Sequence, residues 1–235
     1  MASLPSELKS RYPNTEKLSR PQSLLEVAQK LRENDHPTVA LEVAEHGLTV
    51  DGYHRDVLAE WLRDRAASMN EPDLALRAAI TAFEESLSVS TYQAVEELAD
   101  DWEDVQSELL ASLRDQNPSS NHAAEVFLQE ELYDDVIDVA ERSGRSSVIE
   151  TVVTAVKTER PQWVISTCKS QAEPIIEQGK HDSYRTAVRW LRRAGEAAEA
   201  ANELEAWRDY VETVRDDHYR KYKLRPMLED LLEEF

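Results

Sequence analysis

Histidines and the single cysteine are the side chains of this sequence that could do metal or nucleophilic chemistry. The six histidines are dispersed, at His36, His46, His54, His122, His181 and His218. None has a second histidine three or four residues away, the spacing that would turn two imidazoles toward one zinc ion from a helix. The lone Cys168 excludes a disulfide within this sequence and a zinc site built from several cysteines. The sequence therefore predicts no metal site and no cofactor.

Acid–base and nucleophilic catalysis have no clear signature either. There is no Gly-rich phosphate loop, no GxSxG and no HExxH. Adjacent carboxylates such as Asp216-Asp217 carry little information among 47 acidic residues, and neighbours in a helix point in different directions. His181-Asp182 is typical of a helix start, and Cys168 of a small buried apolar side chain. We expect a protein that is not an enzyme.

The charge is strongly acidic but the chain is not a disordered acidic segment. Asp and Glu number 47 against 27 Lys and Arg, a net charge of -20, while 41% of the residues are hydrophobic. That apolar content can form a core, so the carboxylates indicate a solvated acidic surface. Such surfaces are typical of proteins from halophilic, salt-rich cytoplasms; an ordinary acidic protein in an ordinary cell is the alternative.

No segment indicates a membrane or secretion. The sequence has no run of about 18 apolar residues, the length that a membrane span needs. Its first residues, MASLPSELKSRYPNTEKLSR, lack the apolar stretch of a signal peptide. We expect a cytoplasmic protein without a membrane segment.

The elements that would position any site are helices. Apolar residues recur at spacings of three and four nearly throughout, as in Leu24, Ala28 and Leu31. No stretch alternates with period two between turn dipeptides, which would indicate strands. Pro174 predicts a kink or a break in the helix that begins near Pro161. The sequence predicts an all-α fold.

A repeat is visible in the first half. Residues 36–41 (HPTVAL) and 71–76 (EPDLAL) are alike at an offset of 35 residues, and 133–140 (YDDVIDVA) is a weaker copy. The offset is close to the period of about 34 residues in tetratricopeptide repeats. We therefore expect a tetratricopeptide-like α-α superhelix of stacked antiparallel helix pairs; coincidence among Ala- and Leu-rich helices is the alternative.

The domain organisation follows from the same pattern. We expect an N-terminal arm at 1–20 and a single helical-repeat domain at 21–235. Within it, residues 180–235 should form a C-terminal helical hairpin and a short closing helix after Pro226, because a stack of helices needs a cap over its last apolar face.

Two basic stretches stand out in this acidic chain. Residues 183–195 (SYRTAVRWLRRAG) and 218–225 (HYRKYKLR) contain four cations each and no carboxylate. Arginines three or four positions apart lie on neighbouring turns of one helix face. The candidate partner-binding residues are Arg185, Arg189, Arg193, Arg220, Lys221, Lys223 and Arg225.

Three interpretations of these cations compete. They can be structural, by finishing a helix or by pairing with carboxylates of a facing helix, for which Glu203, Glu205, Asp209 and Glu212 are available. They can bind an acidic protein partner. Together with Tyr219 and Tyr222 they can also bind a nucleic-acid backbone and its unstacked bases. For 218–225 we favour the structural role.

The C-terminal region resembles that of prokaryotic SWIM zinc-finger proteins, a family in which a Tyr–Ala–Leu helix is followed by an aromatic–Tyr–Leu-rich helix and a basic, Leu-rich end. The matching residues are Tyr184, Ala187, Leu191, Trp207, Tyr210, His218, Arg220, Lys221, Leu224 and Leu228. The resemblance covers roughly the last 55 residues, and the family's CxC and CxH finger is missing. It implies a helical-repeat module that works beside nucleic-acid machinery, and it implies no zinc ligand and no catalytic residue.

These observations predict a non-catalytic protein–protein interaction scaffold of helical-repeat type. The expected partner is a protein that contacts the concave face of the stack or the C-terminal hairpin. The alternative is a nucleic-acid-associated adaptor that binds through residues 183–195 and 218–225.

Overall fold

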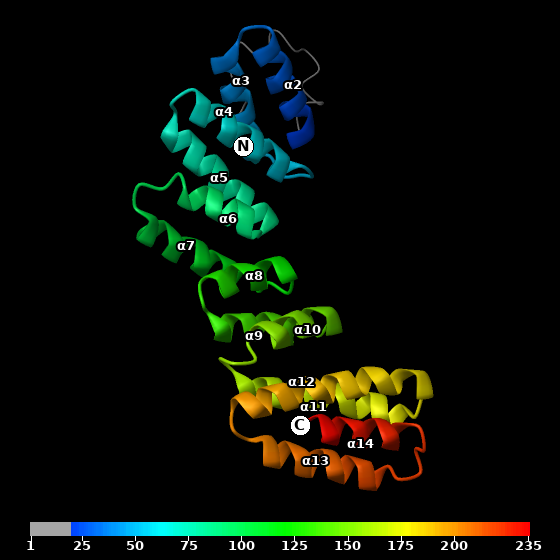
Figure 1. The fold of residues 1–235 in the computed structure, drawn as a ribbon. Helices are drawn as coiled ribbons and strands as arrows, with labels where there is room; N and C mark the ends of the chain where they lie inside the picture. Colours follow the sequence, from blue (N-terminus) through cyan, green and yellow to red (C-terminus); the bar gives the residue numbers. More distant parts are fainter. Residues whose placement is uncertain (1–19) are drawn as a thin grey trace. The chain divides into compact units, whose positions relative to one another are not determined.

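The computed structural model describes residues 20–235 and contains only helices there (Figure 1). Most of the predicted N-terminal arm, residues 1–19, lies outside the described residues. The first helices are α2 (Pro21–Glu33), α3 (Pro37–Leu48), α4 (Arg55–Ser68), α5 (Pro72–Ser86), α6 (Val89–Glu96), α7 (Trp102–Asp115) and α8 (Asn121–Gln129). They are followed by α9 (Tyr133–Ser143), α10 (Ser146–Ala155), α11 (Pro161–Gln178), the 3₁₀ turn η2 (His181–Ser183), α12 (Tyr184–Ala200), α13 (Leu204–Asp217) and α14 (Leu224–Glu234).

The predicted all-α fold of packed neighbouring helices is confirmed in this described part. Consecutive helices such as α2 and α3, α4 and α5, and α11 and α12 pack against each other. The apolar positions that gave the helical period are the buried ones: Leu24, Ala28 and Leu31 of α2 are at most 5% exposed. The finer likeness to tetratricopeptide repeats stays a prediction.

The chain divides into two compact units, one that ends at Glu130 and one that spans Glu131–Phe235. The sequence predicted a single domain over 21–235. Two compact units do not decide whether the chain unfolds in one step, so the single domain stays a prediction.

The same turn joins the helices of three pairs. After α2, α4 and α12, a residue with positive φ follows the helix: Asp35 (59°), Asn70 (61°) and Asn202 (59°). The next amide then donates to a carbonyl five residues back, as from Glu71 to Ala66 (2.9 Å). This is the Schellman arrangement, in which a left-handed residue lets the chain satisfy the last carbonyls of a helix.

These turns explain the repeat in the sequence. The matched segments 36–41 and 71–76 each start at such a turn and continue into a helix whose first residue is Pro37 or Pro72. Proline suits the first helical position because its missing amide hydrogen would have no partner there. The offset of 35 residues is thus the length of one helix pair with its turns.

In the second unit, α11 and α12 lie side by side, and α13 and α14 pack against α12 and against each other (Figure 1). The apolar stripe of α12, with Tyr184, Val188, Leu191 and Ala194, is buried. Helix α14 closes this group, with Leu224, Leu228, Leu231 and Leu232 buried.

Helix α11 is continuous from Pro161 to Gln178 with Pro174 inside it, so the predicted break does not occur. Proline removes one amide donor, here the donor to the carbonyl of Ser170, four residues earlier. Pro174 and Ser170 both lie beside an open cavity, described below. Beyond the proline, Ile176 is buried, so the last turn of the helix still packs against its neighbours.

Close packing fixes α12 against the helices around it. A Cβ on Gly195 would lie 2.9 Å from atoms of both Phe235 and Trp207, so only glycine fits there. Trp207 is 1% exposed and packs against Phe235, with 4.8 Å between ring centroids and the two rings tilted by 59°. These contacts set the position of α12 and with it the position of its arginines.

Candidate functional site

Four arginines form a ridge along α12: Arg185, Arg189, Arg192 and Arg193. We call them the α12 arginine ridge. The structure divides them into two that are tied to carboxylates and two that are not.

Arg192 and Arg193 are tied to other helices. Arg192 holds Glu234 of α14 with two nitrogens, at 2.9 and 2.8 Å. This hydrogen-bonded contact lowers the pKa of Glu234 and raises the pKa of Arg192. Arg193 pairs with Glu150 of α10, and its guanidinium lies 5.1 Å from the ring centroid of Trp190. The predicted carboxylate partners on and beside α13 are not the ones used: the partners come from α14 and α10.

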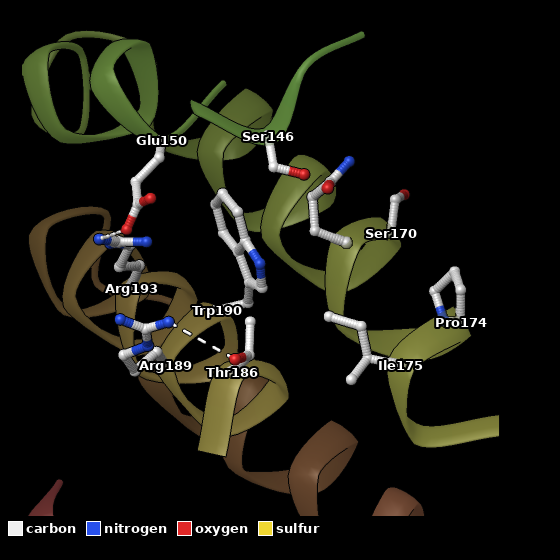
Figure 2. A pocket seen from close by; sticks show the side chains of 10 residues that line it. Ser146, Glu150, Ser170, Pro174, Ile175, Thr186, Arg189, Trp190 and Arg193 are labelled. Carbon is white, nitrogen blue, oxygen red and sulfur yellow. Dashed lines mark hydrogen bonds and ion pairs between the residues drawn. The ribbon is translucent and has the colours of Figure 1, made fainter. Parts of the chain in front are cut away.

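Arg185 and Arg189 make no ion pair with any residue among 20–235 for which the structure gives a contact. Among the described residues, Arg189 donates to the hydroxyl of Thr186 alone, at 3.5 Å, the outer limit of a hydrogen bond (Figure 2). Both side chains are exposed. They thus stand out in a chain of net charge -20, as cations that no carboxylate of the described part compensates.

One side of the ridge borders a cavity of about 420 Å³ between α10, α11 and α12, which we call the α10–α12 cavity (Figure 2). Its lining includes Glu150, Ser170, Thr186, Trp190 and Arg193. Trp190 is only 4% exposed, so its ring forms a wall and presents little free face. The Arg193–Glu150 pair closes one side, which leaves Arg189 as the cation that is not ion-paired there.

The other side of the ridge borders a larger hollow of about 540 Å³ between α12 and α14, which we call the α12–α14 hollow. It is lined by Arg185, Val188, Arg189, Arg192, Met227 and Asp230. Val188 and Met227 supply an apolar floor and the arginines a positive rim. Arg189 lines both this hollow and the α10–α12 cavity.

The second predicted cation group lies between α13 and α14, and part of it is structural. Lys221 donates from Nζ to the backbone carbonyl of Ile176 in the last turn of α11, where a helix carries partial negative charge. Arg225 pairs with Glu229 one turn along α14, at 2.9 Å. Arg220 lies 5.4 Å from the ring centroid of Tyr219 and donates to its hydroxyl at 2.9 Å.

Two exposed tyrosines accompany these cations. Tyr219 is 59% exposed and Tyr222 is 67% exposed, and the ring of Tyr222 meets His181 edge-on at 5.6 Å. Lys223 is exposed at the N-terminal cap of α14, and the described residues give it no side-chain hydrogen bond or ion pair. The stretch 218–225 therefore holds both docking contacts and side chains that face solvent.

The candidate catalytic side chains are placed apart from one another. Cys168 is fully buried in α11, and burial raises the pKa of its thiol to about 12. No group of three or more His, Cys, Asp or Glu side chains within residues 20–235 could hold a metal ion. Over the same residues, no helix is long and apolar enough to cross a membrane.

Sequence reasoning found the arginines but missed the residues that make hollows beside them. Met227, Val188 and Trp190 carry no signal of binding in a sequence, because apolar residues at helical spacing predict only a buried face. Glu150 and Glu234 were equally hidden among the other acidic residues. The comparisons add no relative: no family model, curated protein or solved structure matches this chain.

Proposed function

We propose that this protein is a non-catalytic interaction module that binds an acidic partner protein through the α12 arginine ridge. One observation carries the proposal: within residues 20–235, Arg185 and Arg189 have no carboxylate partner, although the chain is rich in carboxylates. Exposed cations of an acidic protein attract the carboxylates of an acidic partner. Elsewhere on the two acidic surfaces the carboxylates repel each other, so the cations favour one orientation of approach.

The ion pairs on either side support this role. Arg192 and Arg193 are tied to Glu234 and Glu150, so they brace α12 against α14 and α10. A side chain that is held before binding loses less freedom on binding. The ridge thus combines two fixed arginines with two that remain available.

We further propose that the protein works in a salt-rich cytoplasm, as its acidity suggests. At 1 M salt the Debye length is about 3 Å, so exposed carboxylates repel each other weakly. Contacts formed at the ridge would then depend on direct pairing at short range and on apolar burial, more than on attraction over a distance.

The test is affinity capture from a lysate treated with nuclease, with the wild-type chain and the Arg185→Gln/Arg189→Gln variant as baits. We expect a protein that the wild type retains and the variant loses. Retention by both baits would contradict a role for the ridge. The Arg215→Gln variant, which changes an arginine of α13 that pairs with Asp216, is the matched control.

A nucleic-acid adaptor is the second candidate function, and the exposed tyrosines favour it. Tyr219 and Tyr222 stand beside Arg220 and Lys223, and stacking of bases on aromatic rings next to cations is the usual mode of single-strand binding. The resemblance to the SWIM family points the same way. Bound material that disappears on nuclease treatment, and on changing both tyrosines to Ser, would support this candidate.

A further inference from the structure

We propose that the α12–α14 hollow binds a short partner segment in which acidic residues flank one bulky apolar side chain. The inference rests on the proposed function, because it names the chemistry of what the ridge binds.

The floor suits an apolar side chain. Val188 is 7% exposed, Met227 is half-buried, and both side chains line the hollow. A volume of about 540 Å³ is within the range of about 300–1,000 Å³ that ligand pockets have. Methionine adapts its flexible side chain to different shapes, which allows several bulky apolar residues to fit.

The rim suits carboxylates on either side of that apolar residue. Arg185 and Arg189 are four residues apart on α12, which places them one turn, or about 6 Å, apart along the helix axis. Neither is used in an ion pair within the described residues. A guanidinium can hold a carboxylate with two parallel hydrogen bonds, while its aliphatic stem covers the apolar group beside it.

The hollow is formed before anything binds. The pair between Arg192 and Glu234 joins its two walls, α12 and α14, at 2.8 Å. The contact of Gly195 with Phe235 brings the chain after α14 against α12 as well. Because the hollow is preformed, binding loses little conformational entropy of its side chains, so even a short segment can bind.

The acidic residue in the lining disfavours a nucleic acid in the α12–α14 hollow. Asp230 lines the α14 side of the hollow, where it would repel an evenly charged phosphate backbone. Val188 and Met227 offer no hydrogen-bond partner to the polar edges of bases. A peptide can place its carboxylates at the arginine side only, which fits the one-sided distribution of positive charge.

The experiment measures fluorescence anisotropy of a short fluorescein-labelled peptide, with a central Leu between Asp and Glu residues, titrated with the full chain. We expect binding that weakens about tenfold, or 1.4 kcal/mol, in Arg185→Gln/Arg189→Gln, since each such step is a factor of ten in Kd. Met227→Glu should weaken it as well, because it places a carboxylate on the floor. Arg215→Gln should bind like the wild type. Far-ultraviolet circular dichroism checks that each variant is folded.

Two peptide controls separate the floor from the rim. Replacing the central Leu with Ser removes the apolar contact, and replacing Asp and Glu with Asn and Gln removes the charge; both peptides should bind more weakly. Equal binding of the Leu and Ser peptides would overturn the role of the hollow. Equal binding by the wild type and Arg185→Gln/Arg189→Gln would overturn the role of the rim.

The outcome also distinguishes this inference from the proposed function. If a captured partner depends on Arg185 and Arg189 but the peptide ignores Met227→Glu, the interaction module stands and the hollow is excluded as its binding site. If neither partner capture nor peptide binding changes in Arg185→Gln/Arg189→Gln, both proposals fail. Tighter binding of a labelled single-stranded oligonucleotide, lost in the same arginine variant, would assign the ridge to nucleic acid.

Discussion

The indole Nε1 of Trp207 in α13 donates a buried hydrogen bond of 3.0 Å to the backbone carbonyl of Leu191 in α12. An atom of the same indole ring lies only 2.9 Å from the position that a Cβ on Gly195 would take. One tryptophan thus satisfies its own polar atom and occupies the space that glycine leaves. The placement of the α12 arginine ridge depends on this contact.

Gly195→Ala should destabilise the protein. The added methyl group would meet Trp207 and Phe235 at 2.9 Å, and overpacking of this kind costs about 1–3 kcal/mol. That cost outweighs the gain of up to about 1 kcal/mol that alanine has over glycine in a helix. Urea unfolding followed by circular dichroism measures the difference. Glu199→Ala on the same helix is exposed and should change stability by less than about 0.5 kcal/mol. An equally stable Gly195→Ala would contradict the prediction and show that Trp207 and Phe235 can shift to make room for the methyl group.

The pair between Arg192 and Glu234 should contribute little to stability but should depend on salt. Both side chains are partly exposed, at 39% and 45%, and such pairs contribute about 0–1 kcal/mol. A double-mutant cycle with Arg192→Gln and Glu234→Gln measures the coupling. We expect a measurable coupling free energy at 0.05 M salt and a smaller one at 1 M, where screening shortens the Debye length to about 3 Å. A coupling that does not change with salt would mean that the bidentate geometry, and not charge, holds the pair.

Cys168 should be unreactive in the folded protein. Its thiol is fully buried, and burial raises its pKa to about 12, so almost no thiolate exists at pH 8. Modification by a thiol reagent should be slow in buffer and fast in urea, where the side chain is exposed. Fast labelling under native conditions would indicate that α11 opens locally. Cys168→Ala should abolish labelling in both conditions.

His218 should make stability depend on pH near neutrality. Burial, followed by the nearby Lys221, lowers the pKa of its imidazole below 6.5, against the opposing charges of Asp217 and Glu177. The unfolded chain therefore binds a proton more readily than the folded one. This contribution to stability is complete above pH 6.5 and is lost as the pH falls toward the lowered pKa. Comparing unfolding of the wild type and His218→Gln between pH 5 and 7.5 isolates it; parallel pH profiles would contradict it.

Salt should stabilise the whole protein. A net charge of -20 on 235 residues implies repulsion in the folded state, which added ions screen. We expect Tm to rise between 0.1 and 2 M KCl. Sodium sulfate at equal ionic strength separates screening from ion exclusion, because sulfate also strengthens apolar burial. A Tm that falls with KCl would contradict adaptation to a salt-rich cytoplasm.

The helices and their repeat were predictable because both are local. Pro37 and Pro72 mark the start of equivalent helices, and Asn70 and Asn202 occupy left-handed positions that asparagine tolerates well. Asp35 in the same position shows that the turn accepts more than one type of residue. The turn is therefore harder to recognise in a sequence.

The partners of the ridge were not predictable because they are distant in sequence. Glu150 and Glu234 are 43 and 42 residues from the arginines they hold. Only the packing of α10 and α14 against the same group of helices brings them close. The hollow beside Met227 arises in the same way, as space between two helices that no single segment describes.

Pro174 makes the hydrogen-bonding groups on the two sides of α12 unequal. Because proline has no amide hydrogen, the carbonyl of Ser170 beside the α10–α12 cavity lacks its helical donor and can accept a bond. Arg189 lines both this cavity and the α12–α14 hollow, so its donors serve both sides of α12, whereas the carbonyl freed by the proline belongs to the cavity side alone. A polypeptide that crosses α12 would meet arginine donors on both sides and this extra backbone acceptor on one side only. The two directions in which a chain can run across α12 are therefore not equivalent.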